Sequence, residues 1–311
     1  MSMTRLETFC NLGYRRDPFT GGALFETGDM ARVRRILTMA VESRAMVSIV
    51  GERGIGKSRA VETALEKIGV RRISVERAQK ERVTIADVQK AMLIDLKESP
   101  KRDGELMGRQ LRRVVGEASA KNGAKPMVVV IEEAQRLHGN TLRSLKTLRE
   151  IEWLGERELF GVILVAQSDP MNRAGVAEVR LRTDLIRMQG LSPDEASAYL
   201  RATIGRHFDD AALEAVGVLP QAANYLELQE LAVALLNHSL ADGRGLVCKA
   251  DVAAVAGSHT AEPLPKTRPT QGAKPEPVSG ATALRSVLSR RNEGGEQVPG
   301  TGNQDNGRFA C

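Results

Sequence analysis

Aromatic residues are scarce in this chain, in which one Trp, three Tyr and six Phe make up only 3% of 311 residues. The three cysteines, Cys10, Cys248 and Cys311, lie far apart and form no CxxC pair or Cys/His cluster that could bind zinc. No run of about 18 apolar residues occurs, and the first residues lack the pattern of a signal peptide. These absences exclude a disulfide scaffold and predict a protein of the reducing cytoplasm that neither crosses a membrane nor is secreted.

The rest of the composition is that of an ordinary globular protein. Hydrophobic residues make up 42% of the chain, charged residues make up 27%, and the net charge is +6. A positive charge of this size is compatible with a polyanionic partner but does not require one. The length allows one large domain or a core domain with smaller satellites, and the composition excludes a collagen, a coiled-coil rod and a wholly disordered chain.

Short apolar runs alternate with helical patterns in the first two thirds of the chain. Strands are predicted at residues 46–50, 72–75, 127–131, 162–165 and 185–189. Helices are predicted at residues 30–42, 58–67, 85–97, 106–120 and 141–154. Trp153 is expected on the apolar side of the last helix. Because buried Val- and Ile-rich strands separated by helices form parallel sheets, the predicted fold is an α/β sandwich.

The pattern divides the chain into four parts. An N-terminal segment (1–45) precedes an α/β core (46–191), and a small all-helical domain (192–256) follows, opening with a capping-box-like sequence at Ser192 and containing a long apolar helix around residues 225–240. Residues 257–311 are rich in Pro, Gly and polar residues and are predicted to be a disordered tail. Within this tail, residues 281–291 form a short basic segment that could contact a partner, although a solvated tail is the preferred interpretation.

The sequence GERGIGKS at residues 51–58 fits the phosphate-binding pattern GxxxxGKS, and it lies between a predicted strand and a predicted helix. Its glycines let successive backbone N–H groups turn toward a β-phosphate at a helix N-terminus. Lys57 is suited to the β- and γ-phosphates, and the Ser58 hydroxyl is suited to Mg²⁺. The sequence therefore predicts ATP and Mg²⁺ as cofactors, with a nucleotide-binding set of Gly51, Glu52, Arg53, Gly54, Ile55, Gly56, Lys57, Ser58 and Arg59.

Two further buried strands are predicted to end in polar side chains at the same edge of the sheet. The run MVVVI is followed by Glu132 and Glu133, and the run VILVA is followed by Gln167. The first of these resembles a Walker B motif in which Glu132 replaces the usual metal-binding Asp, one methylene longer. Glu133 is predicted to be the base that orients the attacking water, and Gln167 could reach the γ-phosphate or that water.

Taken together, GERGIGKS, IEEAQRL and VAQSD resemble the AAA+ ATPases, and within them the group that includes ExeA, TniB, TnsC and the B protein of phage Mu-like elements. The similarity covers roughly residues 17–255 in layout, and the spacing resembles the phage Mu-like target-DNA activator. It implies that Gln167 takes the place of sensor 1 and that Arg180 or Arg182 is an arginine finger reaching a neighbouring subunit. The pattern does not distinguish the two arginines.

The chain departs from this group at two places. The segment before the phosphate loop has no room for the helix-turn-helix domain of the phage Mu protein. In addition, Gln221 stands where ExeA-like members carry a sensor 2 arginine, so sensor 2 is expected to be missing or degenerate.

Two sets of basic residues are candidates for DNA contacts. In the resembling transposition ATPases, the loop after the second strand faces a central channel, and here it contains Arg77, Lys80 and Arg82. A second stripe lies on the helix after the acidic pair, at Arg143, Lys146 and Arg149. An ordinary solvated face is an equal alternative for both sets. Because no aromatic residue is interleaved with either set, duplex backbone is favoured over stacked single strands.

The resemblance implies an ATP-dependent protein that oligomerises on double-stranded DNA without sequence specificity, as a ring or a helical filament. It would recruit or activate a transposase in a bacterial or phage-host cytoplasm, and ATP hydrolysis would dissolve the assembly. An ExeA-like secretion or cell-envelope ATPase is the main alternative, but it predicts a membrane segment and a wall-binding domain that this sequence does not show. A signalling NTPase of the STAND type would need a winged helix and long repeats, for which the chain is too short.

Overall fold

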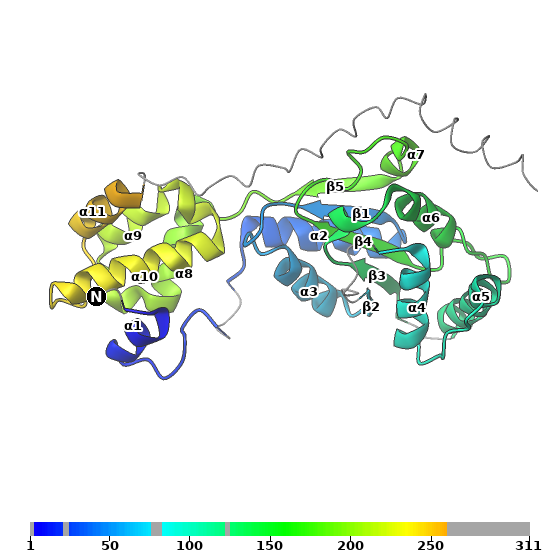
Figure 1. The fold of residues 1–311 in the computed structure, drawn as a ribbon, viewed down its shortest axis with the longest axis horizontal. Coiled ribbons are helices and arrows are strands. Elements are labelled where there is room, and N and C mark those ends of the chain that lie inside the picture. The colour runs from blue at the N-terminus through cyan, green and yellow to red at the C-terminus, as the bar shows by residue number, and fades with distance from the viewer. Residues whose placement is uncertain (1–2, 21–24, 76–82, 122–124, 260–311) are drawn as a thin grey trace, which may run out of the picture. The chain divides into compact units, whose positions relative to one another are not determined.

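The computed structural model describes residues 3–20, 25–75, 83–121 and 125–259 (Figure 1). By its contacts, the chain from Met1 to Ala261 forms one compact unit. Five strands form a parallel sheet in the order β2-β3-β4-β1-β5, so the predicted α/β class is confirmed. The strands are β1 (Met46–Val50), β2 (Arg71–Val75), β3 (Met127–Ile131), β4 (Gly161–Ala166) and β5 (Thr183–Arg187).

Strand β5 begins and ends two residues earlier than predicted, because its bounds depend on its pairing with β1 and not on the apolar run alone. Thr183 lies opposite Met46, and Arg187 lies opposite Val50. As an edge strand, β5 pairs only with β1, and Ile186 is its one buried residue. Met188 is buried but follows the strand, whereas the apolar pattern predicts it within the strand.

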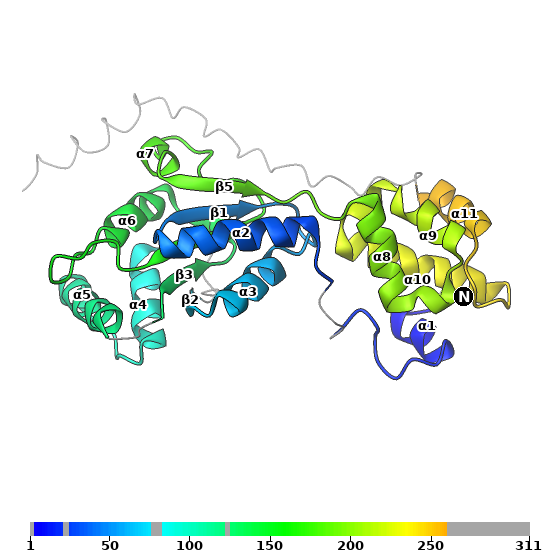
Figure 2. The same cartoon turned by 180° about the vertical axis from the view of Figure 1, so that it is seen from behind.

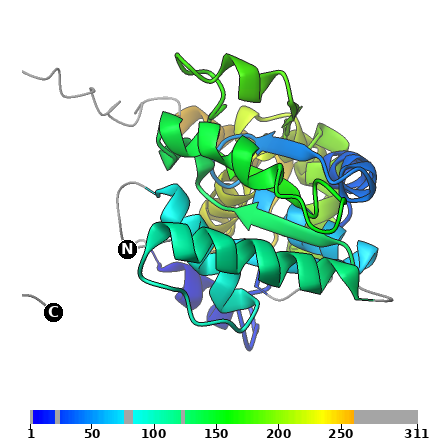
Figure 3. The same cartoon turned by 90° about the vertical axis from the view of Figure 1, so that its right-hand side faces the viewer.

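Helices cover both faces of the sheet (Figures 1 and 2). Residues of α2 and α3 share one apolar cluster with β1, β3 and β4. Residues of α4, α5 and α6 share another with the opposite face, and Figure 3 shows these layers from the side. The helices are α2 (Gly28–Glu42), α3 (Lys57–Ile68), α4 (Ile85–Asp95), α5 (Gly104–Ala120), α6 (Gly139–Arg149) and α7 (Ala177–Arg180).

Trp153 does not lie on a helix, contrary to the sequence prediction. Helix α6 ends at Arg149, and Trp153 forms an isolated antiparallel bridge with Glu156. The residues between them, Leu154 and Gly155, have φ values of 50° and 87°, which a right-handed helix cannot contain. The expected packing of Trp153 is confirmed in part, because its indole is partly buried against the apolar cluster that includes α5.

Two glycines of α5 give a matched stability test. A Cβ atom at Gly116 would lie 2.1 Å from Trp153 Cγ, whereas a Cβ at Gly108 meets nothing within 4 Å. We expect Gly116→Ala to lower the free energy of unfolding by about 1–3 kcal/mol, because the indole must move. Gly108→Ala should raise it by about 0.5–1 kcal/mol through helix propensity. Urea unfolding of both variants measures this, and a stable Gly116→Ala protein would contradict the close packing of Trp153.

A helical unit follows the sheet, made of α8 (Pro193–Ile204), α9 (Asp210–Gly217), α10 (Tyr225–Ala241) and α11 (Lys249–His259). The capping box at Ser192 is present, with Glu195 as its partner. Helix α1 (Arg5–Asn11) joins the same core through the buried Phe9. The predicted segment 1–45 is therefore divided, because α1 packs with the helical unit and α2 packs on the sheet.

The connection between sheet and helical unit is held by hydrogen bonds from its backbone to a side chain of α2. The Asp29 carboxylate accepts the backbone N–H groups of Gln189 and Gly190, at 2.6 and 2.9 Å. Gly190 has a φ of 93°, and a Cβ there would lie 2.1 Å from the Ala223 carbonyl oxygen. In the described part of the chain, no helix combines the length and apolar content needed to cross a membrane.

Candidate functional site

The loop between β1 and α3 requires glycine at two positions. Gly54 and Gly56 have φ values of 87° and 89°, in the left-handed region that favours glycine. Their surroundings leave no room for a side chain, since a Cβ at Gly54 would lie 2.3 Å from Asn224 Oδ1. Gly56 is also the N-cap of α3 and offers no side-chain cap, so the first N–H groups of the helix remain available to an anion.

A pocket of about 230 Å³ lies at this loop and at the carboxyl ends of β3 and β4. It brings together the five chemically distinctive residues of the sequence prediction: Lys57, Ser58, Glu132, Glu133 and Gln167. Arg53, Gly54, Gly56 and Arg59 also line it. Gly51, Glu52 and Ile55 instead line a neighbouring cavity of about 360 Å³, together with Arg187, Asn224 and Glu227.

The Lys57 ammonium reaches back to the first two residues of the loop. Its Nζ donates to the carbonyl oxygens of Gly51 and Glu52, at 2.8 and 2.6 Å. Partial burial lowers the pKa of Lys57, while the nearby Glu133, Glu132 and Glu52 carboxylates oppose that shift. Phosphate oxygens would offer the ammonium charged acceptors in place of these carbonyls.

Ser58 and Glu132 place two oxygen atoms side by side. The Ser58 hydroxyl donates to Glu132 Oε2 at 3.0 Å, so the longer acidic side chain still reaches the helix. Mg²⁺ binds oxygen ligands in an octahedron at about 2.0–2.1 Å, which places adjacent ligands roughly 3 Å apart. The two side chains therefore fit a shared Mg²⁺ ion in both chemistry and spacing.

Glu133 is held by two carboxamides at the strand ends. Gln135 Nε2 and Gln167 Nε2 both approach Glu133 Oε2, at 2.8 and 3.3 Å. Gln135 Oε1 in turn accepts the backbone N–H of Gln167 at 3.1 Å. Gln135 is not among the residues predicted for the site, although it stands within the IEEAQRL segment that carries the resemblance.

The two candidate finger arginines differ in their partners. Arg182 forms ion pairs with Glu150 at 3.0 Å and with Glu178 at 3.8 Å. Arg180, the last residue of α7, is exposed, and within the described residues no hydrogen bond or ion pair holds its guanidinium. A third arginine, Arg187, is not among the predicted finger residues; it lies 3.8 Å from Asp169 and lines the neighbouring cavity.

The structure describes only one of the two sets of candidate DNA contacts. Arg77, Lys80 and Arg82 lie outside the described residues. The stripe on α6 is not a free cationic face. Arg143 donates to the Gly175 carbonyl at 3.0 Å, Lys146 pairs with Glu178, and Arg149 pairs with Glu158, with side-chain exposures of only 22% for Lys146 and 16% for Arg149. These three cations lie beside carboxylates and carbonyls that become neighbours only in the folded chain.

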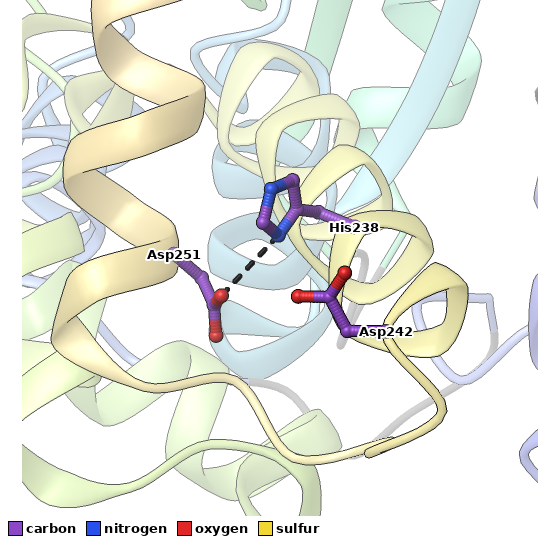
Figure 4. A group of neighbouring side chains, drawn as sticks. All are labelled: His238, Asp242 and Asp251. Atoms are coloured by element: carbon purple, nitrogen blue, oxygen red, sulfur yellow. Dashed lines mark ion pairs between the residues drawn. The ribbon is translucent and has the colours of Figure 1, made fainter.

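A separate group of polar side chains joins α10 to α11: His238, Asp242 and Asp251 (Figure 4). Their oxygen and nitrogen atoms could surround a cation, but the Arg244 guanidinium already donates to both carboxylates, with nitrogen–oxygen distances of 2.6 to 3.0 Å. Hydrogen bonds from Arg244 hold the pKa of the Asp251 carboxyl well below its usual range. These side chains therefore stabilise the packing of α10 against α11 within the helical unit.

Comparison with known proteins agrees with this geometry. Residues 40–173 match the sequence profile of a family described as AAA domain. The fold is similar to Cdc6p from Pyrobaculum aerophilum, with 12% identity, a TM-score of 0.56, and coverage of 78% of this chain and 70% of that chain. No curated protein matches the sequence.

Two ORC structures are similar to the same degree. The ORC2 protein of Aeropyrum pernix, in ADPNP and ADP complexes, has 15% identity and a TM-score of 0.56, over 80% of this chain and 72% of that chain. Drosophila ORC bound to DNA has 12% identity and a TM-score of 0.55, over 79% and 64%. The match of residues 40–173 and these structural similarities show the P-loop AAA+ fold, so the predicted fold class is confirmed.

Proposed function

We propose that this chain is an ATPase that binds ATP with Mg²⁺ at the pocket beside β1, β3 and β4. The convergence of Lys57, Ser58, Glu132, Glu133 and Gln167 on that pocket is the observation that supports the proposal. Lys57 and the loop N–H groups would hold the β- and γ-phosphates. Mg²⁺, held by Ser58 and Glu132, would neutralise phosphate charge.

Glu133 would accept the proton of the attacking water. Its carboxylate lines the phosphate pocket and is oriented by two amide donors, as a general base must be. Gln167 lines the same pocket and contacts Glu133, which suits a residue that positions the water or the γ-phosphate. The chemical step proposed is hydrolysis of the γ-phosphoanhydride bond.

We propose Arg180 as the finger that completes the site of a neighbouring subunit, because Arg182 is already paired within its own chain. Arg180→Ala should lower the rate of ATP hydrolysis by about 10³-fold without changing ATP affinity, since a finger acts on the transition state. Arg182→Ala is the matched control and should change the rate little, because exposed ion pairs contribute at most about 1 kcal/mol.

A mixing experiment tests whether this arginine acts between subunits. Arg180→Ala subunits would bind ATP but lack a finger, whereas Lys57→Ala subunits would bind ATP poorly but carry the finger into assemblies with ATP-bound subunits. A mixture should therefore hydrolyse ATP faster than the sum of its parts. A fully active Arg180→Ala protein, or loss of activity in Arg182→Ala instead, would contradict the assignment.

We further propose that the ATP-bound protein oligomerises on duplex DNA without reading its sequence and recruits or activates a transposase. Support comes from the resemblance to the transposition ATPases, the net charge of +6 and the fold similarity to Drosophila ORC bound to DNA. The segment containing Arg77, Lys80 and Arg82 is the preferred DNA contact, because the cations on α6 already have protein partners.

Duplex binding in three nucleotide states tests this part of the proposal. The purified protein is titrated with unrelated duplexes in the presence of ATP, of ADP and of no nucleotide, across a salt series. Tight binding with ATP alone, equal for all duplexes and falling steeply with salt, is the expected result. Co-sedimentation of a candidate transposase with the ATP-bound complex then tests recruitment. Equal, weak DNA binding in all three states would contradict the proposal and would favour a protein or cell-envelope partner.

A further inference from the structure

The helical unit touches the phosphate loop through three consecutive residues. Asn224 donates from Nδ2 to the Arg53 carbonyl oxygen at 2.7 Å. Leu226 and Asn224 both pack against Gly54, and the Tyr225 ring packs against Gly56, so that a Cβ at either glycine would lie 2.3 to 3.2 Å from them. The loop is therefore held from the side of α10 as well as by its own strand and helix.

The Asn224 side chain forms hydrogen bonds with both α10 and the loop. Its Oδ1 accepts the backbone N–H of Leu226 at 3.0 Å and so caps α10, while its Nδ2 reaches the loop. The side chain is buried, with 8% exposure, and both ends of its amide are bonded. Because Oδ1 must face an N–H donor and Nδ2 must face a carbonyl, these contacts fix the orientation of the amide.

The contact with Arg53 also fixes the next N–H group of the loop. In a trans peptide the C=O and the following N–H point in opposite directions, so the Gly54 N–H points away from Asn224. Gly54 lines the phosphate pocket, whereas Asn224 lines only the neighbouring cavity. We infer that Asn224 is a positioning residue that turns the Gly54 N–H toward the phosphates and links the helical unit to the occupancy of the site.

This inference rests on the proposed ATP binding, and it concerns a contact other than sensor 2, which the sequence predicts to be missing or degenerate. Gln221, which stands in place of a sensor 2 arginine, lies in the short helix η3 (Pro220–Ala223) before α10. In the structure, the neighbouring Asn224 makes the contact, and it touches the loop backbone through an uncharged group. The helical unit would thus respond to the shape of the loop and not to the charge of the γ-phosphate.

Asn224→Ser separates the loop contact from the helix cap. Serine is as good an N-cap as asparagine, so α10 should keep its stability, but the shorter side chain cannot span the distance to Arg53. We expect ATP to bind about tenfold more weakly to Asn224→Ser, the loss that follows from one misoriented donor to a charged group. The Tm should be unchanged, and Gln221→Ala, the matched control, should bind ATP as the unmodified protein does.

Amide hydrogen exchange without nucleotide gives a second readout that does not depend on ATP. The loop at residues 51–56 should exchange faster in Asn224→Ser than in the unmodified protein, while peptides from α10 remain unchanged. Unchanged loop exchange, or unchanged ATP affinity in a variant of normal Tm, would overturn the inference. Failure of the unmodified protein to bind ATP would instead overturn the proposed function, and the exchange measurement would still decide the role of Asn224.

Discussion

Glu133→Gln should lower the rate of ATP hydrolysis by about 10²–10⁴-fold while leaving ATP affinity nearly unchanged. The amide cannot accept a proton from water, and general-base catalysis contributes a factor of this size. The substitution keeps the size of the side chain, so Gln135 and Gln167 can still contact its remaining oxygen. Steady-state phosphate release and equilibrium titration with ATP measure the two quantities separately.

Glu117→Gln provides the control for this substitution. Glu117 lies on α5 and pairs with Arg113 at 3.2 Å, and it does not line the phosphate pocket. Its removal should leave hydrolysis unchanged. If Glu133→Gln hydrolysed ATP at the unmodified rate, Glu133 would not be the base. If the proposed function is correct, Glu133→Gln should also stay on DNA longer, because ATP is bound but not consumed.

Lys57→Ala should weaken ATP binding by on the order of 100-fold, and hydrolysis should fall with it. The Lys57 ammonium lies at the start of the loop, where it donates to the carbonyl oxygens of Gly51 and Glu52. Charge-assisted hydrogen bonds to phosphate are worth about 1.5–3 kcal/mol each. Titration with a fluorescent ATP analogue measures the affinity. DNA binding should then become the same with and without ATP.

Lys67→Ala is the corresponding control on the same helix. Lys67 stands at the other end of α3, 3.5 Å from Glu26 and outside the pocket. ATP affinity and Tm should change little in this variant, because an exposed ion pair contributes at most about 1 kcal/mol. Equal ATP affinity in Lys57→Ala and Lys67→Ala would show that the loop does not hold the nucleotide phosphates.

Lys57→Ala and Glu133→Gln also separate the steps of the proposed cycle. Lys57→Ala on its own should fail before assembly, whereas Glu133→Gln should assemble and then fail to dissociate. A protein in which both variants bind DNA equally, whatever the nucleotide, would be a DNA-binding protein that nucleotide does not control.

Local sequence patterns were sufficient for much of the fold. The runs at residues 46–50 and 127–131 are strands with the predicted bounds, because a strand buried on both faces is apolar throughout and can be recognised from its own residues. The loop at residues 51–58 could also be recognised from its own residues, since its glycines, lysine and serine lie within one short segment. Candidate site residues that follow strands could also be found, because parallel strands end at one edge of the sheet.

Contacts between distant residues could not be predicted in this way. Gln167 meets Gln135 from a neighbouring strand end, Asn224 meets Arg53 across 171 residues, and Lys146 meets Glu178 from another helix. Trp153 lies beyond the end of α6, two residues with positive φ follow it, and Gly116 of α5 leaves space for its ring. Amino-acid spacing reports periodicity within one element. The partner of a polar side chain depends on how elements pack, so the fold alone makes Gln135 and Asn224 neighbours of the site and makes the cations of α6 partners of carboxylates.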